Sequence, residues 1–167
     1  MTIQELNQLN KTQLRIELEK CCGAEKWIEK MLSSFPVADE EDLLNIADEK
    51  WAECSEADWL EAFTHHPKIG DIDALKKKFA STSIWASNEQ SGVQSATDAI
   101  IEALAKGNND YENKFGFIFI VCATGKSAVE MLELLEMRLN HSREYELHIA
   151  AAEQAKITQL RLKKLLA

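Results

Sequence analysis

The chain has 167 residues, of which 46% are hydrophobic and 28% are charged, and its net charge is −9. This length suits one domain with a substantial core. Six glycines and two prolines are too few for a strand-rich fold with many tight turns, and the acidic balance disfavours binding to phosphate backbones. We expect a single all-α domain over residues 1–167 that binds no nucleic acid.

The cysteines and the two ends of the sequence indicate in which cellular compartment the protein is expected. None of the four cysteines (Cys21, Cys22, Cys54 and Cys122) has CxxC spacing, which favours a reduced, cytoplasmic protein without a zinc or disulfide framework. The N-terminal stretch lacks the apolar core of a signal peptide, and the last residues lack an SKL address. The longest apolar run is too short to cross a bilayer, so we expect no membrane partner.

Cap signals and apolar residues at helical spacing predict helices along most of the chain. The predicted helices begin after Thr2 and then occupy about 10–23, 27–31, 39–54, 55–66, 71–80, 87–107, 127–140 and 143–167. Gly23 and Gly107 are expected to end two of them, because glycine is common just after a helix.

One stretch departs from helical spacing. Residues 115–122 read FGFIFIVC, which is uniformly apolar and strand-like. A single extended segment cannot form a sheet alone. We therefore expect a multi-helix bundle with one buried, mostly non-helical segment near 115–123.

The adjacent histidines of FTHHPKIGD (63–71) differ in their predicted direction. With Trp59 as reference, His66 continues the apolar face of its helix, whereas His65 points away. Pro67 disfavours helical geometry at the preceding residue, so the helix should end there with His66 directed inward. The partial negative charge at a helix C-terminus favours a protonated imidazole. From the residues alone, His66 is either a catalytic group or an ordinary helix-terminal histidine.

Two further charged residues fall on apolar faces. Glu89 heads a stripe with Val93, Ala96 and Ile100, and it is either a functional carboxylate or a first-turn acid that the helix dipole favours. Arg161 lies between Ile157 and Leu165, one turn to each side, so it needs an anionic ligand or a carboxylate partner, for which Glu89 itself is a candidate.

Three other motifs are weak. ATGKS (123–127) resembles the end of a phosphate-binding loop, but Ile120 stands where its first glycine should be. HSREYELH (141–148) lacks the HExxH spacing of a zinc site, and KKK (76–78) is a short basic run. We interpret the last two as solvated surface.

Four stretches together resemble the OHCU decarboxylase family, in which OHCU is 2-oxo-4-hydroxy-4-carboxy-5-ureidoimidazoline. They are HHPKIGD, WASNEQSGV, KFGFIFIVCATGKSA and EQAKITQLRLKKLL, and they occur in the family's order. The resemblance implies an all-α homodimer that converts OHCU to (S)-allantoin in uric acid degradation without a cofactor or metal.

The resemblance also implies site residues. His66, Glu89 and Arg161 match the family's catalytic histidine, glutamate and arginine. The implied substrate contacts are Pro67, Ala86, Ser87, Asn88, Gln90, Phe119, Ile120, Val121, Cys122 and Ala123. Many family members have serine at the position of Ala86, so that hydroxyl is absent here or is supplied by Ser87.

Two rival hypotheses remain open at the level of the sequence. A helical interaction module without chemistry predicts that His66, Glu89 and Arg161 are scattered. A metal hydrolase that uses His65 and His66 predicts a bound metal ion.

Overall fold

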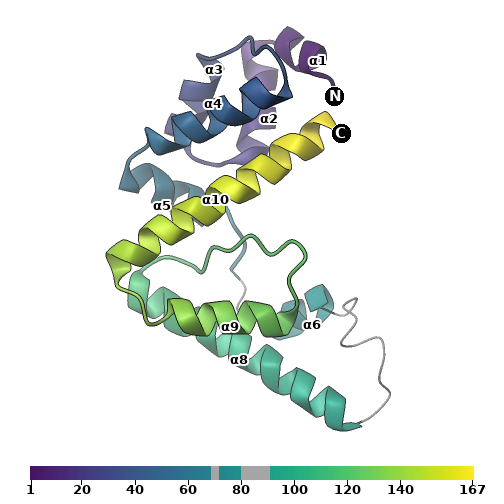
Figure 1. The fold of residues 1–167 in the computed structure, drawn as a ribbon, viewed down its shortest axis with the longest axis vertical. Helices are drawn as coiled ribbons and strands as arrows, with labels where there is room; N and C mark the ends of the chain where they lie inside the picture. Colours follow the sequence, from purple (N-terminus) through teal and green to yellow (C-terminus); the bar gives the residue numbers. More distant parts are fainter. Residues whose placement is uncertain (69–71, 80–90) are drawn as a thin grey trace. The chain divides into compact units, whose positions relative to one another are not determined.

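The computed structural model describes residues 1–68, 72–79 and 91–167, and every regular element in them is a helix (Figure 1). The helices are α1 (Ile3–Gln8), α2 (Lys11–Cys21), α3 (Glu25–Leu32), α4 (Glu40–Ala52), α5 (Glu56–Thr64), α6 (Ile72–Phe79), α8 (Ser91–Phe115), α9 (Ala128–Arg138) and α10 (Arg143–Leu166). The predicted all-α class is confirmed.

Local capping explains where several helices begin. Thr2 and Ser55 each form a capping box, with Glu5 and Asp58 respectively, and Ser127 caps α9. In each case a side-chain oxygen accepts a hydrogen bond from a backbone N–H that has no partner within the helix. These three starts were predicted from the sequence and are confirmed.

The chain divides into two compact units. The first unit comprises residues 1–66 and 150–167, which include α1 to α5 and most of α10. The second unit comprises residues 67–149, which include α6, α8, α9 and the first turns of α10. That residues 1–167 form one domain stays a prediction.

Tryptophan side chains join the helices of the first unit. In this unit α3 packs against α2, α4 and α5. The buried Trp27 donates a hydrogen bond from its indole Nε1 to the carbonyl of Ala47 at 3.1 Å, and Trp51 donates to the carbonyl of Ala151 at 2.9 Å. A buried indole N–H needs such an acceptor. The second bond ties the first half of α10 to α4.

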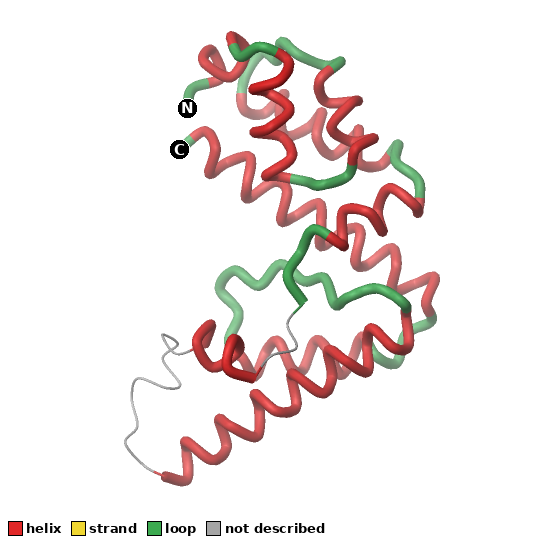
Figure 2. The backbone as a smooth tube through the Cα atoms, turned by 180° about the vertical axis from the view of Figure 1, so that it is seen from behind, coloured by secondary structure: helices red, strands yellow, loops and turns green. Residues whose placement is uncertain are grey.

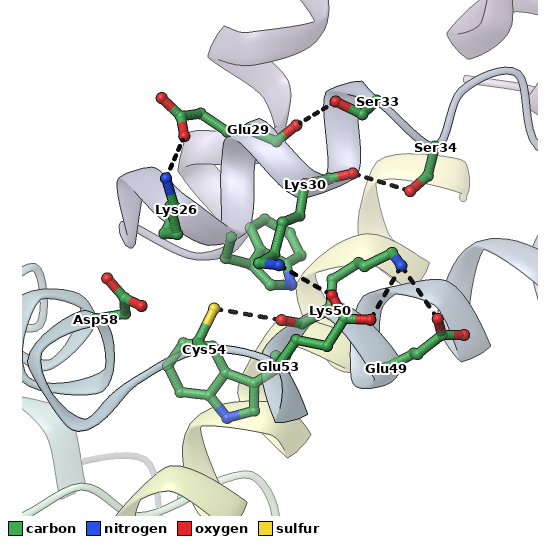
Figure 3. Close-up of polar contacts among 12 residues, drawn as sticks. Lys26, Glu29, Lys30, Ser33, Ser34, Glu49, Lys50, Glu53, Cys54 and Asp58 are labelled. Atoms are coloured by element: carbon green, nitrogen blue, oxygen red, sulfur yellow. Dashed lines mark hydrogen bonds and ion pairs between the residues drawn. The ribbon is translucent and has the colours of Figure 1, made fainter.

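Surface ion pairs connect α3 to the end of α4 (Figure 3). Glu53 accepts from Lys30 at 3.0 Å and from Lys50 at 3.2 Å, and Lys50 also contacts Glu49 at 3.1 Å. These groups are well solvated, so each pair adds little to stability. The buried side chains beneath them hold the two helices together.

In the second unit, α8 packs against α6 and α9 and runs through Gly107 without a break. The prediction that Gly107 ends this helix was therefore wrong. A Cβ at Gly107 would lie 2.6 Å from Cδ2 of the buried Leu135 on α9. The glycine serves close packing of α8 on α9, and this tertiary contact outweighs its low helix propensity.

The segment between α8 and α9 is non-helical, as predicted (Figure 2). It starts at Gly116, whose φ of +81° favours glycine, and it contains a second positive φ at Gly125. Between these glycines five apolar side chains are buried, namely Phe117, Phe119, Ile120, Val121 and Cys122. The apolar composition of the stretch thus reflects burial, not strand formation.

Candidate functional site

His66 follows directly on the C-terminus of α5. The helix ends at Thr64, His65 is its C-cap, and the backbone N–H of His66 donates to the carbonyl of Phe63 at 3.2 Å. The predicted helix end just before Pro67 is confirmed. The His66 side chain is partly buried, and its ring Nε2 is hydrogen-bonded to Oε1 of Gln154 on α10.

Burial lowers the pKa of His66 below its ordinary value of 6.5. The hydrogen bond to Gln154 acts in the opposite direction, whereas the neighbouring charges of Arg161 and His65 lower the pKa further. The helix C-terminus favours the cation, but desolvation outweighs it, and the ring is neutral at pH 7.

Arg161 lies on α10, seven residues and two turns after Gln154. Its guanidinium Nη1 is 3.4 Å from the carbonyl oxygen of Lys20 and 3.5 Å from that of Cys21, which are long hydrogen bonds. Among the residues that the structure describes, no carboxylate pairs with this half-buried arginine. Its charge is therefore available to an anion.

A cavity of about 590 Å³ contains both residues. It lies in the first unit, between α2, the end of α5 and the last turns of α10. Its walls carry the permanent cations Lys20, Arg161 and Lys164, the acids Glu17 and Glu19, and the two histidines. Glu17 is paired with Lys20 at 2.9 Å, so two of the three cations have no acidic partner within the cavity. The site suits a small anionic molecule.

Gly23 and His65 also belong to the wall of this cavity. The helix α2 ends at Cys21, with Cys22 as its cap, so Gly23 is not needed to end it. Any side chain at Gly23 would collide with the imidazole ring of His65. The ring therefore lies directly on the Gly23 backbone, and His65 is part of the site although the helical projection turned it away.

The nearby cysteine thiols are not nucleophiles. Burial raises the pKa of Cys21 to about 11 and that of Cys22 to about 12. A thiol reacts as the thiolate, so both groups are inert at pH 7. Histidine and arginine are then the groups of this cavity that can take part in chemistry with an anion.

The predicted contact segment Phe119–Ala123 belongs to the second unit. Its backbone is held by a buried network around Arg138, which is 3% exposed. Arg138 donates to the carbonyl of Ile120 at 2.6 Å and forms an ion pair with the fully buried Glu146. The hydroxyl of Tyr111 donates to the same carboxylate at 2.5 Å. The loop conformation is thus fixed by a charged pair at its base.

In this segment, two backbone carbonyl groups accept hydrogen bonds, whereas most of the backbone N–H groups have no acceptor among the described residues. The carbonyl of Cys122 accepts from Nζ of Lys126 at 2.8 Å, and that of Ala123 accepts from the backbone N–H of Lys126 at 3.1 Å. Within the described part of the chain, no acceptor is recorded for the backbone N–H groups of Phe119, Ile120, Val121 and Ala123. The segment therefore offers donors to a ligand.

The remaining predicted contacts lie elsewhere. Pro67 is exposed at the start of the second unit. Ala86, Ser87, Asn88, Glu89 and Gln90 lie outside the described residues. Among the described side chains, no group of three or more His, Cys, Asp or Glu is placed to hold a metal ion. None of the helices drawn from these residues is long and apolar enough to cross a membrane.

Sequence reasoning missed Gln154 and Thr158. Both are buried, with exposed fractions of 0% and 5%, and both lie on the face of α10 that carries Ala150 and Arg161. The signal was present, because polar residues one turn apart interrupt an apolar helical stripe.

The all-helical fold and a neutral histidine beside an arginine define a candidate acid–base site for a small anion. Residues 7–163 match the family described as OHCU decarboxylase. The chain therefore belongs to the OHCU decarboxylase family. The predicted family, and with it the predicted class of enzyme, a carboxy-lyase, are confirmed.

Individual relatives agree with this assignment. The uric acid degradation bifunctional protein TTL of Arabidopsis thaliana is 40% identical over 152 residues, which cover 89% of this chain and 46% of that protein. This chain thus spans less than half of the plant protein. A 2-oxo-4-hydroxy-4-carboxy-5-ureidoimidazoline decarboxylase of Halalkalicoccus jeotgali is 26% identical over 166 residues, which cover 99% of this chain and 92% of that protein.

Two solved structures share the fold. A crystal structure of an OHCU decarboxylase in the presence of (S)-allantoin is 35% identical, has a TM-score of 0.70, and covers 90% of this chain and 96% of its own. A crystal structure of an (S)-allantoin synthase is 17% identical, has a TM-score of 0.72, and covers 98% of this chain and 54% of its own. The second likeness concerns the fold alone.

Proposed function

We propose that this chain catalyses the decarboxylation of OHCU to (S)-allantoin, a step of uric acid degradation. The observation that carries the proposal is that His66 and Arg161, far apart in the sequence, line one cavity. Family membership supplies the reaction, and the cavity supplies an acid–base group together with a cation that no described carboxylate pairs with.

The reaction breaks the bond between the carboxylate and a ring carbon. The electron pair of that bond moves into the substrate's ring, CO₂ leaves, and a proton is then added to a ring carbon. Arg161 holds the anionic group through its planar fork of donors. His66 assists loss of the carboxylate and delivers the proton to one face, which gives the (S) product.

Glu89 completes the proposed catalytic set by accepting hydrogen bonds from the hydroxyl or ureide N–H groups of the substrate. Pro67 and the residues Ala86, Ser87, Asn88 and Gln90 are the proposed neighbouring contacts. The backbone N–H groups of Phe119, Ile120, Val121 and Ala123, which find no acceptor among the described residues, support a further contact, because such donors match the carbonyl or carboxylate oxygens of a ureide.

Variants of His66 and Arg161 test the proposal with freshly prepared OHCU. General acid catalysis contributes roughly 10²–10⁴-fold, so His66→Ala should lose about that factor in kcat while it remains folded. Arg161→Gln should lose about 10- to 100-fold in kcat/KM, the equivalent of about 1.5–3 kcal/mol for hydrogen bonds to a charged group.

His148→Ala and Arg15→Gln are matched controls. His148 is an exposed histidine of the second unit, and Arg15 pairs with Glu25 at 2.6 Å on the surface of the first. Both controls should keep the wild-type rate. A pure, folded His66→Ala enzyme that decarboxylated OHCU at the wild-type rate would remove His66 from the mechanism.

We further propose that the protein is a cytoplasmic homodimer. The family resemblance supports the dimer, and four free, buried thiols are consistent with a reducing compartment. Light scattering on the purified protein tests the first part, because a dimer gives twice the mass of one chain.

A further inference from the structure

A chain of buried hydrogen bonds leads from the ring of His66 into α10. Oε1 of Gln154 is bonded to Nε2 of His66, and Nε2 of Gln154 donates to Oγ1 of Thr158 at 3.1 Å. Oγ1 of Thr158 lies 3.0 Å from the carbonyl oxygen of Gln154 and 3.4 Å from that of Cys21. Every member of this chain belongs to the first unit.

The contacts of Thr158, at the end of this chain, determine which groups in the chain donate and which accept hydrogen bonds. A hydroxyl has one hydrogen, and the two carbonyls next to Thr158 can only accept. In the structure the hydroxyl donates to the carbonyl of Gln154 at 3.0 Å, which leaves the lone pairs of Oγ1 to accept from the amide nitrogen of Gln154. The amide oxygen must then face His66. Since that oxygen only accepts, Nε2 of His66 carries the hydrogen.

The other ring nitrogen is left for the substrate. Nδ1 of His66 has no hydrogen-bond partner among the described residues, and His66 lines the cavity. In the neutral ring with hydrogen on Nε2, Nδ1 holds a lone pair and accepts a proton. Glutamine suits this arrangement better than a carboxylate, because it orients the ring without adding a charge that would favour the cation.

We infer that Gln154 and Thr158 are positioning residues, which hold His66 in the Nε2–H tautomer so that Nδ1 exchanges the proton of the reaction. This inference rests on the proposed function. Nδ1 takes up one proton from substrate or water. After the carbon–carbon bond has broken, the electron pair on the ring carbon takes that proton, and the lone pair returns to Nδ1. Gln154 and Thr158 touch neither substrate nor proton.

Thr158→Val tests the positioning role with the smallest change of shape. It removes the acceptor that fixes the amide of Gln154, so the amide can rotate and the tautomer is no longer enforced. The ¹⁵N chemical shifts of the His66 ring report the tautomer directly. We expect Nε2–H in the wild type and a mixture with Nδ1–H in Thr158→Val, with kcat lowered by roughly 10- to 100-fold, as for partners that orient a ligating histidine.

Gln154→Glu gives a second readout that a purely structural role would not move. A carboxylate next to Nε2 should raise the pKa of His66, so the acid limb of the pH–rate profile moves to higher pH. The charged and titratable groups that line the cavity around His66 are Glu17, Glu19, Lys20, Cys21, His65, Arg161 and Lys164, and all stay unchanged in this variant.

Gln159→Leu is the matched control. Gln159 is on the same helix and donates to the carbonyl of Leu44 at 2.8 Å, outside this cavity. Gln159→Leu should leave both the tautomer of His66 and the pH–rate profile unchanged. Hydrogen on Nδ1 in the wild type, or an unchanged tautomer in Thr158→Val, would overturn the inference. A wild-type protein with the Nε2–H tautomer but no decarboxylation would instead overturn the proposed function.

Discussion

At the scale of single residues, the site depends on how burial acts on His66. The ring is desolvated, no acid among the described residues lies within hydrogen-bond distance of it, and it is hydrogen-bonded to a neutral amide. Such an environment holds the pKa below the ordinary value of 6.5. A neutral histidine at pH 7 begins the reaction as a base and ends it as an acid.

The pH dependence of kcat/KM follows from this shift. Protonation of the free enzyme at His66 blocks the base, so activity should be constant near pH 7 and fall as the pH drops through the lowered pKa. We expect the midpoint of the acid limb below 6.5, measured as initial rates on fresh OHCU in buffers of equal ionic strength. A midpoint above 6.5 would show that the charged form of His66 is favoured in the cavity.

At the scale of secondary-structure elements, the segment between α8 and α9 is held by ionic contacts from its own unit. Arg138 comes from the end of α9 and Glu146 from the first turns of α10. Together with Tyr111 of α8 they form one buried cluster that binds the Ile120 carbonyl. Three helices thus determine the conformation of one loop.

Glu146→Gln tests this cluster. The substitution leaves Arg138 buried without its counter-charge, which typically costs about 3–5 kcal/mol when one partner of a buried pair is removed. We expect a loss of that size in the free energy of unfolding, measured by urea denaturation. Asp110→Asn, which removes the exposed pair of Asp110 with Lys106 in the same unit, is the control and should change stability little. Equal losses in the two variants would contradict the role of the cluster.

At the scale of the whole molecule, the sequence predicted what depends on local chemistry. The caps at Thr2, Ser55 and Ser127 involve residues three positions apart, so they can be found without the fold. The burial of the apolar stretch after Gly116 was also predictable from its composition. Family membership followed from four motifs that span most of the chain.

Features that depend on distant contacts were not predictable in this way. The local sequence predicts a helix end at Gly107, because it does not reveal the contact of this glycine with Leu135 on another helix. The lowered pKa of His66 was not predictable, because its desolvation comes from tertiary packing, which also places Gln154 of α10 beside it. The place of Glu89 in the site stays a prediction.

The central claim is that this chain carries the whole stereospecific decarboxylation. The most direct measurement is circular dichroism of freshly generated OHCU after addition of the purified protein. We predict that decay of the substrate accelerates and that the signal of (S)-allantoin grows in proportion to the substrate consumed. Decay at the uncatalysed rate to an optically silent racemate would contradict the claim.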